Sequence, residues 1–386
     1  MIDRLLKPLL IERLSQMPAV ALLGPRQCGK TTLAKSCGGI YLDIEQEKGR
    51  TRLDIGWEGF LGGKELLILD EAQTFPEVFQ RLRGVIDEDR PRNGRFLLLG
   101  SVSPALMMGV SESLAGRLGI LELTPLLLPE IGFERLDDLW LSGGYPDGGI
   151  ISSQDFPSWE NDYLRLMTER DLPIWGLKAG PRMTERLLKM TAVLNAQPLN
   201  LSQLGQSLGI SHPTVRGYLD FLEGAYLLRS LPSFHANIRK RLIKAPRLYC
   251  RDTGLLHSLM GVKTFDQLLD QPWVGASWEG FVIEQIIALY GTLGQYPDYY
   301  YFRTSDGHEI DLIVEFANER IGIEIKCTHS PALQDLRRLK KTAELCGCTK
   351  TYLISRTSEP LVNETGGSVN LAGFLQIITE GSKQAP

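Results

Sequence analysis

No apolar run in this sequence is long enough to cross a bilayer, which excludes a membrane-spanning helix. The opening segment 1–14, MIDRLLKPLLIERL, has charged residues among its apolar positions and no small-residue cleavage site. This pattern is typical of an amphipathic helix and not of a signal peptide. We therefore expect a cytoplasmic protein with no membrane partner.

Cysteine is scarce and follows no pattern. Of the six, Cys346 and Cys348 form a close pair without a second pair at ligand spacing, and the others are scattered at Cys28, Cys37, Cys250 and Cys327. This distribution argues against a disulfide scaffold and a four-ligand zinc site, and it indicates free thiols in a reducing compartment.

A large excess of charge of one sign is also missing. The chain carries 42 Lys and Arg against 46 Asp and Glu, a net charge of −4. A uniformly basic nucleic-acid binder is excluded, so any such site must be a local patch. No internal repeat or low-complexity segment is present, and 386 residues with 43% hydrophobic content predict two or three globular domains.

The most informative stretch present is 18–35, PAVALLGPRQCGKTTLAK. An apolar run typical of a buried strand is followed by the phosphate-loop pattern G-x-x-x-x-G-K-[ST] and then by a helical pattern. Glycines let successive N–H groups face an anion, and the helix N-terminus adds partial positive charge. We expect Lys30 to reach the β- and γ-phosphates of ATP and the Thr31 hydroxyl to ligate Mg²⁺. The predicted nucleotide-binding residues of the loop are Gly24, Pro25, Arg26, Gln27, Cys28, Gly29, Lys30, Thr31 and Thr32.

Later strands of this region end in polar residues. The run 66–70, LLILD, ends at Asp70 and is followed by Glu71, and the run 96–99 is followed by Gly100 and Ser101. Asp70 is predicted to hold Mg²⁺ through water, Glu71 to polarise the attacking water and Ser101 to sense the γ-phosphate. Strands 39–43 and 118–123, alternating with helices, predict a parallel sheet with helices on both faces.

The order of these motifs, with SLAGR before the last strand, resembles an AAA+ ATPase. With Gly143-Gly144-Tyr145-Pro146, it resembles more narrowly the bacterial and archaeal ATPases that carry a C-terminal domain of unknown function. The resemblance implies a ring-type homo-oligomer in which Arg117 reaches the γ-phosphate of a neighbouring subunit; the local alternative is a cap or ion pair. It also implies a helical lid over 126–180.

The stretch 199–222 has helix-turn-helix spacing, with Gly209-Ile210-Ser211 between two apolar-periodic helices. Ser211 is predicted to cap the second helix, and 225–231 with 247–250 are expected to form a wing. Contact with the DNA backbone is expected from His212, Thr214 and Arg216 on the second helix and from the basic run Arg239, Lys240, Arg241, Lys244, Arg247 and Arg251. The alternative is a packing module or a protein interface.

The C-terminal region predicts a helix over 278–290, strands over 299–303, 309–315 and 320–326, a helix over 332–345 and a strand over 351–355. Asp311, Glu324 and Lys326 resemble the site of PD-(D/E)xK nucleases, although Ile310 stands where that pattern has proline. The resemblance implies that Asp311 and Glu324 hold Mg²⁺, that Lys326 steadies the nucleophile or phosphate, and that Glu279 or Glu284 is the helix glutamate. A solvated Glu–Lys pair is the structural alternative.

We therefore expect an α/β fold: an AAA+ P-loop core over 1–125, the lid over 126–180, a winged helix-turn-helix over 181–260 and a nuclease-like domain over 261–386. The predicted function is ATP-driven, Mg²⁺-dependent DNA processing or remodelling, with branched DNA as the substrate suggested by analogy. The alternative is a nucleotide-dependent switch or scaffold with protein partners and an inactive nuclease-like domain.

Overall fold

The computed structural model describes residues 2–102, 114–151, 156–235 and 243–384. The chain forms two compact units: Met1–Leu126 with the short stretch Gly224–Tyr226, and Leu127–Glu223 with Leu227–Pro386. None of the helices in the described ranges combines the length and apolar character needed to cross a membrane.

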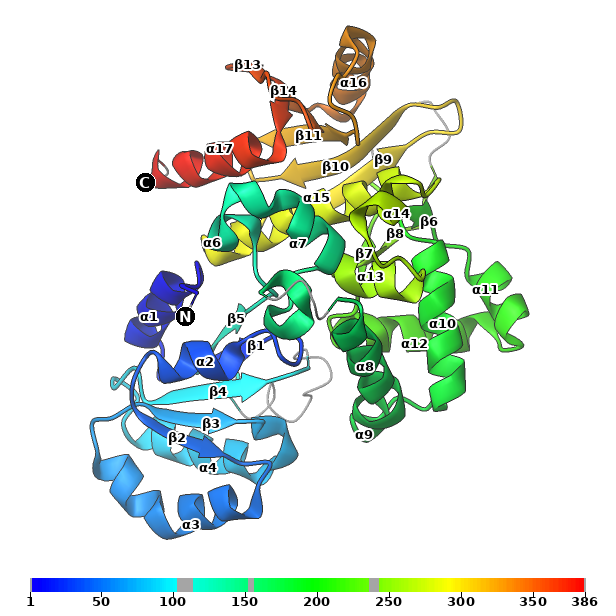
Figure 1. Cartoon of the computed structure of the whole chain (residues 1–386). Helices are drawn as coiled ribbons and strands as arrows, with labels where there is room; N and C mark the ends of the chain where they lie inside the picture. Colours follow the sequence, from blue (N-terminus) through cyan, green and yellow to red (C-terminus); the bar gives the residue numbers. More distant parts are fainter. Residues whose placement is uncertain (1, 103–113, 152–155, 236–242, 385–386) are drawn as a thin grey trace. The chain divides into compact units, whose positions relative to one another are not determined.

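The first unit is built on a five-stranded, fully parallel sheet (Figure 1). Its strands have the spatial order β2-β3-β4-β1-β5. They are β1 (Ala19–Leu23), β2 (Ile40–Asp43), β3 (Leu67–Asp70), β4 (Phe96–Gly100) and β5 (Leu118–Glu122). This confirms the parallel sheet expected from the alternation of strands and helices. Because β1 lies between β4 and β5, the chain leaves β1 at a point where ligands bind in open α/β sheets.

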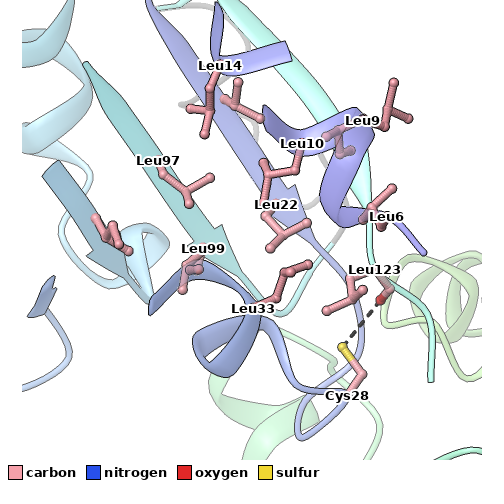
Figure 2. Close-up of a cluster of buried hydrophobic side chains, with 14 residues drawn as sticks. Leu6, Leu9, Leu10, Leu14, Leu22, Cys28, Leu33, Leu97, Leu99 and Leu123 are labelled. Carbon is pink, nitrogen blue, oxygen red and sulfur yellow. Dashed lines mark hydrogen bonds between the residues drawn. The ribbon is translucent and has the colours of Figure 1, made fainter. Parts of the chain in front are cut away.

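Four helices cover the sheet: α1 (Lys7–Gln16) and α2 (Lys30–Lys35) lie on one face, and α3 (Glu47–Gly62) and α4 (Glu77–Glu88) on the other (Figure 1). Figure 2 shows how leucines of α1 and α2 meet alternate residues of β1 and β4, such as Leu22, Leu97 and Leu99. The amphipathic N-terminal helix predicted from the sequence thus packs into the core of the first unit.

The second unit begins with short helical segments and a helical pair. These elements are α6 (Leu128–Ile131), α7 (Leu136–Ser142), α8 (Ser158–Leu166), α9 (Leu172–Ile174), α10 (Pro181–Val193), α11 (Leu201–Leu208), α12 (His212–Gly224), α13 (Thr253–Leu259) and α14 (Phe265–Leu269). The segment expected to form a lid is part of this unit, where Trp140 packs edge-on against Trp278.

A small antiparallel sheet accompanies the helical pair. Its strands are β6 (Gln197–Pro198), β7 (Leu228–Leu231) and β8 (Arg247–Cys250), in the order β6-β8-β7. Along the chain the order is helix, strand, helix, helix, strand, strand, because α10 precedes β6 and α11 and α12 precede β7.

The rest of the second unit is a six-stranded mixed sheet in the order β13-β14-β12-β11-β10-β9. Its elements are α15 (Val274–Thr292), β9 (Asp298–Arg303), β10 (Glu309–Glu315), β11 (Arg320–Ile325), α16 (Leu333–Cys346), β12 (Lys350–Ser355), β13 (Leu361–Asn363), β14 (Gly366–Asn370) and α17 (Leu371–Gln384). Helix α16 packs on one face, and α15 and α17 lie on the other (Figure 1). Both sheets of the unit are joined at β9, where Phe234 N donates to Tyr301 O at 2.7 Å.

Candidate functional site

The loop that follows β1 has a backbone that demands glycine at both ends. Gly24 has φ +151°, and a Cβ there would lie 2.1 Å from the carbonyl oxygen of Leu123. Gly29 has φ +101° and is the N-cap of α2. Lys30 and Thr31 are therefore the first residues of a helix, at the positively polarised end that favours phosphate.

Lys30 is buried, and its ammonium group is directed into the loop. Its Nζ donates to the carbonyl oxygens of Gly24 at 2.9 Å and Pro25 at 2.7 Å. The charge of Lys30 is thus held beside the loop backbone that would surround a phosphate group.

Arg4, which precedes α1, fixes the loop from outside and was missed by the sequence reasoning. Its guanidinium donates to Cys28 O at 2.7 Å and to Pro125 O at 3.3 Å, beyond the end of β5. The Cys28 side chain is buried on the core side of the loop, where Sγ donates to Leu123 O at 3.3 Å (Figure 2). Burial raises the pKa of the Cys28 thiol, which makes it a packing group.

Thr31 and Asp70 meet across the sheet edge. Thr31 Oγ1 donates to Asp70 Oδ2 at 2.7 Å, and the same oxygen accepts from the Tyr41 hydroxyl at 2.8 Å. Magnesium keeps several waters and needs only one or two protein ligands beside phosphate oxygens. The hydroxyl of Thr31 and the carboxylate of Asp70 fit that ion. Like Arg4, Tyr41 on β2 belongs to no sequence motif and was not predicted as a site residue.

Glu71 lies next to this pair in a left-handed conformation, φ +51°. Its Oε1 accepts from Ser101 Oγ at 3.0 Å, and Gln73 Nε2 donates to its Oε2. Burial raises the pKa of Glu71, while the charges of Lys30 and Arg26 oppose that shift. Ser101, just after β4, thus donates a hydrogen bond to the carboxylate of Glu71, just after β3. This contact holds the ends of the two strands together.

Arg117 lies at the amino-terminal ends of the strands, opposite the end that carries the phosphate loop. It directly precedes β5, whose first residue pairs with the first residue of β1, whereas the phosphate loop follows the last residue of β1. Its Nε and Nη2 contact Asp87 of α4 at 2.7 and 2.9 Å. Arg117 therefore cannot reach the loop of its own sheet, and an action on another subunit stays a prediction.

The helical pair is arranged as the turn chemistry predicts. Ser211 Oγ accepts from Thr214 N at 3.3 Å, which confirms the predicted cap of α12. His212, Arg216 and Lys244 are exposed and Thr214 is half-buried, while Arg239, Lys240 and Arg241 lie outside the described residues.

Two of the predicted DNA contacts are wrong, because Arg247 and Arg251 are turned inward. Arg251 Nε pairs with Glu284 at 3.2 Å, and Arg229 Nη2 holds the same carboxylate at 3.0 Å. This assigns Glu284 to a structural network and leaves Glu279 as the helix glutamate of the C-terminal cluster.

That cluster contains Glu279, Asp311 and Glu324, the three carboxylates that the sequence singled out; a nuclease role for them stays a prediction. Asp311 and Glu324 face each other across β10 and β11, and Lys326 Nζ contacts Glu324 Oε1 at 2.7 Å. Burial, followed by the charge of Asp311, raises the pKa of both Glu279 and Glu324.

The carboxylates do not form the expected metal site. Within the described ranges, no group of three or more His, Cys, Asp and Glu side chains is placed to hold a metal ion. Arg247 of β8 lies among them instead, with Nη1 at 3.1 Å from Glu279 Oε1 and 3.3 Å from Asp311 Oδ1. The predicted metal role of Asp311 is at odds with this geometry, because the Arg247 guanidinium already contacts Asp311 Oδ1. Glu324 is not bonded by Arg247: its Oε1 contacts Lys326, and its Oε2 is buried with no hydrogen-bond partner among the described residues.

Family models match three consecutive parts of the chain: an AAA domain over residues 16–132, a domain of unknown function (DUF8612) over 133–266 and another (DUF4143) over 274–371. Among solved structures, the chain is similar to a Walker-type ATPase of Pyrococcus abyssi, with 16% identity, TM-score 0.44 and coverage of 67% of this chain and 96% of that one. A signal transduction ATPase (STAND) protein of Pyrococcus horikoshii gives 13% identity, TM-score 0.30 and coverage of 76% and 47%.

Two curated proteins are much closer in sequence. The uncharacterized proteins Rv2008c of Mycobacterium tuberculosis and Mb2031c of Mycobacterium bovis are each 40% identical over 326 residues, which cover 83% of this chain and 73% of theirs. The chain therefore belongs to the same family as these two mycobacterial proteins, and its first part is a P-loop ATPase domain of the AAA type.

Proposed function

We propose that this protein is a Mg²⁺-dependent ATPase whose nucleotide cycle serves an action on DNA. The observation that carries the first half is the contact between Thr31 Oγ1 and Asp70 Oδ2, with Glu71 as the next residue. It brings the hydroxyl of the phosphate loop to the acidic end of β3, which is the arrangement that nucleotide hydrolysis requires.

Each side chain has a distinct task in this proposal. Lys30 and the loop N–H groups bind the phosphates, and Mg²⁺, held by Thr31 and Asp70, neutralises phosphate charge when bound. Glu71 orients and polarises the attacking water, and Ser101 fixes the Glu71 carboxylate through the 3.0 Å hydrogen bond. Tyr41 and Arg4 are positioning residues that act through Asp70 and the loop backbone.

The decisive variant is Glu71→Gln, which removes the charge and keeps the shape. We expect ATP binding to persist while turnover falls by about 10²-fold or more, since a positioned base contributes that much. Glu65→Gln is the matched control, because Glu65 is exposed just before β3. Unchanged turnover in Glu71→Gln would remove Glu71 from the proposed role.

The second half of the proposal places DNA on α12 and Lys244. Support comes from the winged-helix element order around α11 and α12 and from the exposed side chains of His212 and Arg216 near the start of α12. A helix N-terminus with basic neighbours suits phosphate contacts, and these few side chains favour backbone binding over base reading.

DNA binding is tested by salt titration of binding to labelled single-stranded, duplex and four-way-junction DNA, with ATP turnover followed in the same samples. Arg216→Ala should weaken duplex binding and reduce the slope of log affinity against log salt by about 0.9. Lys263→Ala removes an equal charge from an exposed position after α13 and should change neither. If the protein neither binds DNA at low salt nor changes its turnover, the switch or scaffold alternative replaces the DNA proposal, and the ATPase assignment stands.

A further inference from the structure

The carboxylate cluster of the C-terminal domain has a cation of its own. Arg247 is only 2% exposed, its Nη2 contacts Glu309, and its Nη1 lies between Glu279 and Asp311. The guanidinium also stacks over the Tyr301 ring, 4.7 Å from its centroid. Three elements, α15, β9 and β10, thus surround this arginine of β8.

The oxygens of Asp311 are both in use. Oδ1 accepts from Arg247 at 3.3 Å, and Oδ2 accepts from the backbone N–H of Ile325 at 2.9 Å. Glu279 Oε1 accepts from Arg247 and also from the Tyr249 hydroxyl at 2.6 Å. A divalent ion at Asp311 and Glu279 would have to displace these donors and then remain beside a buried positive charge.

An arginine suits this cavity better than a hydrated ion does. A guanidinium offers five donors in a fixed plane, is weakly hydrated and stacks on aromatic faces, whereas Mg²⁺ gives up its waters reluctantly. Burial works against the charge of Arg247, but the carboxylates around it raise its pKa above the ordinary value. The charge is therefore permanent.

We propose that Arg247 is the resident counter-cation of Glu279 and Asp311 in this cluster and takes the place of a divalent metal between them. The cluster then ties the small sheet of β6–β8 to the C-terminal domain, and it does not support metal-dependent phosphodiester cleavage. This inference does not depend on the ATPase proposal, because it concerns a separate set of residues.

The test is Mn²⁺ binding to the full chain, followed by electron paramagnetic resonance without nucleotide. An Asp70→Asn background removes the carboxylate of the ATPase site. With Arg247 present we expect no bound Mn²⁺. Arg247→Met should create one site per chain, and adding Asp311→Asn should abolish it. Arg251→Met is the control, because it removes a buried arginine that pairs with Glu284 outside the cluster, and it should create no site.

The proposal is overturned if the Asp70→Asn protein with Arg247 intact binds Mn²⁺ and loses it on Asp311→Asn, or if Arg247→Met folds and gains no site. Should Arg247→Met fail to fold, Arg247→Lys decides. A lysine keeps the charge but lacks the fork, so it should restore the fold and still exclude Mn²⁺; Mn²⁺ binding by Arg247→Lys would contradict the counter-cation role.

Discussion

At the scale of single residues, two glycines show two different reasons why a side chain would destabilise the fold: backbone strain alone, and strain together with a steric clash. Gly24 and Gly38 both have positive φ, but a Cβ at Gly24 meets Leu123 O at 2.1 Å, whereas nothing lies within 4 Å of one at Gly38. We expect Gly38→Ala to cost about 1 kcal/mol from backbone strain alone. Gly24→Ala should cost clearly more and abolish ATP binding. Urea unfolding and nucleotide titration measure both, and equal costs would contradict the clash.

The raised pKa of Glu71 leads to a prediction about how turnover depends on pH. In the proposed mechanism hydrolysis needs the ionised form of Glu71, so turnover should fall as pH drops through the raised pKa of Glu71. The hydrogen bond from Ser101 lowers that pKa against the effect of burial. Ser101→Ala should therefore move the acid limb of the kcat profile to higher pH.

A suitable control for the Ser101 experiment is Ser36→Ala, which removes a hydroxyl that bonds Leu33 O at the end of α2. Its acid limb should coincide with that of the unmodified protein. An acid limb that stays in place in Ser101→Ala, or moves to lower pH, would show that the hydroxyl does not act on Glu71.

At the scale of elements, His257 of α13 joins two other helices of the second unit. Its Nδ1 donates to Leu141 O at 2.8 Å, so Nε2 accepts from Ser277 Oγ at 2.7 Å, and Trp140 Nε1 donates to the same hydroxyl at 3.0 Å. Only the neutral imidazole, with its proton on Nδ1, satisfies all of these hydrogen bonds at once. Burial lowers the pKa of His257 to about 4.

The sign of the resulting pH dependence follows from these contacts. Between the unfolded pKa of about 6.5 and the folded value of about 4, the unfolded chain binds a proton that the folded chain does not, so the second unit loses stability as pH falls through this window. The loss should reach on the order of 3 kcal/mol. His257→Gln should flatten this part of the stability profile measured by urea unfolding, and an unchanged slope would assign the dependence to another group.

The strands of the ATPase sheet were predicted to within a residue or two because each is a short apolar run bounded by polar or glycine residues. The last elements, β13, β14 and α17, were missed. Strand β14 begins with Gly366 and Gly367, where a Cβ would lie about 2 Å from facing carbonyl oxygens, and such a pair is typical of a turn. Arg247 was misassigned because a basic residue in a basic run gives no sign that its partners are carboxylates about 30 and 60 residues away.

At the scale of the whole molecule, two compact units predict two thermal transitions. ATP with Mg²⁺ should stabilise only the ATPase unit, by about 2.7 kcal/mol at one hundred times its Kd. Calorimetry of Glu71→Gln, which keeps the nucleotide intact, measures this, and adding Lys30→Ala should remove the shift. A single transition, or an equal shift of both, would contradict independent units.

Arg117 leads to a prediction about turnover in an oligomer of this chain. Its position at the far end of the strands from its own loop excludes a role there, and its ion pair with Asp87 is the local alternative to an action on a neighbour. If Arg117 acts on a neighbouring subunit, turnover per chain should rise with protein concentration, and Arg117→Ala should remove that rise. Arg90→Ala is the control, since Arg90 also approaches Asp87, at 3.6 Å. An equal loss of turnover in dilute, monomeric Arg117→Ala would show a role within one chain.

The burial of Cys28 has a practical consequence for work with this protein. A cysteine inside a nucleotide loop suggests an enzyme that alkylating reagents inactivate, yet this sulfur faces the leucine core, away from the phosphate side. Alkylation can reach it only when the loop detaches from the end of β5. The rate of Cys28 alkylation, followed by mass spectrometry, therefore measures how often the ATP-binding loop opens, and no engineered label is needed.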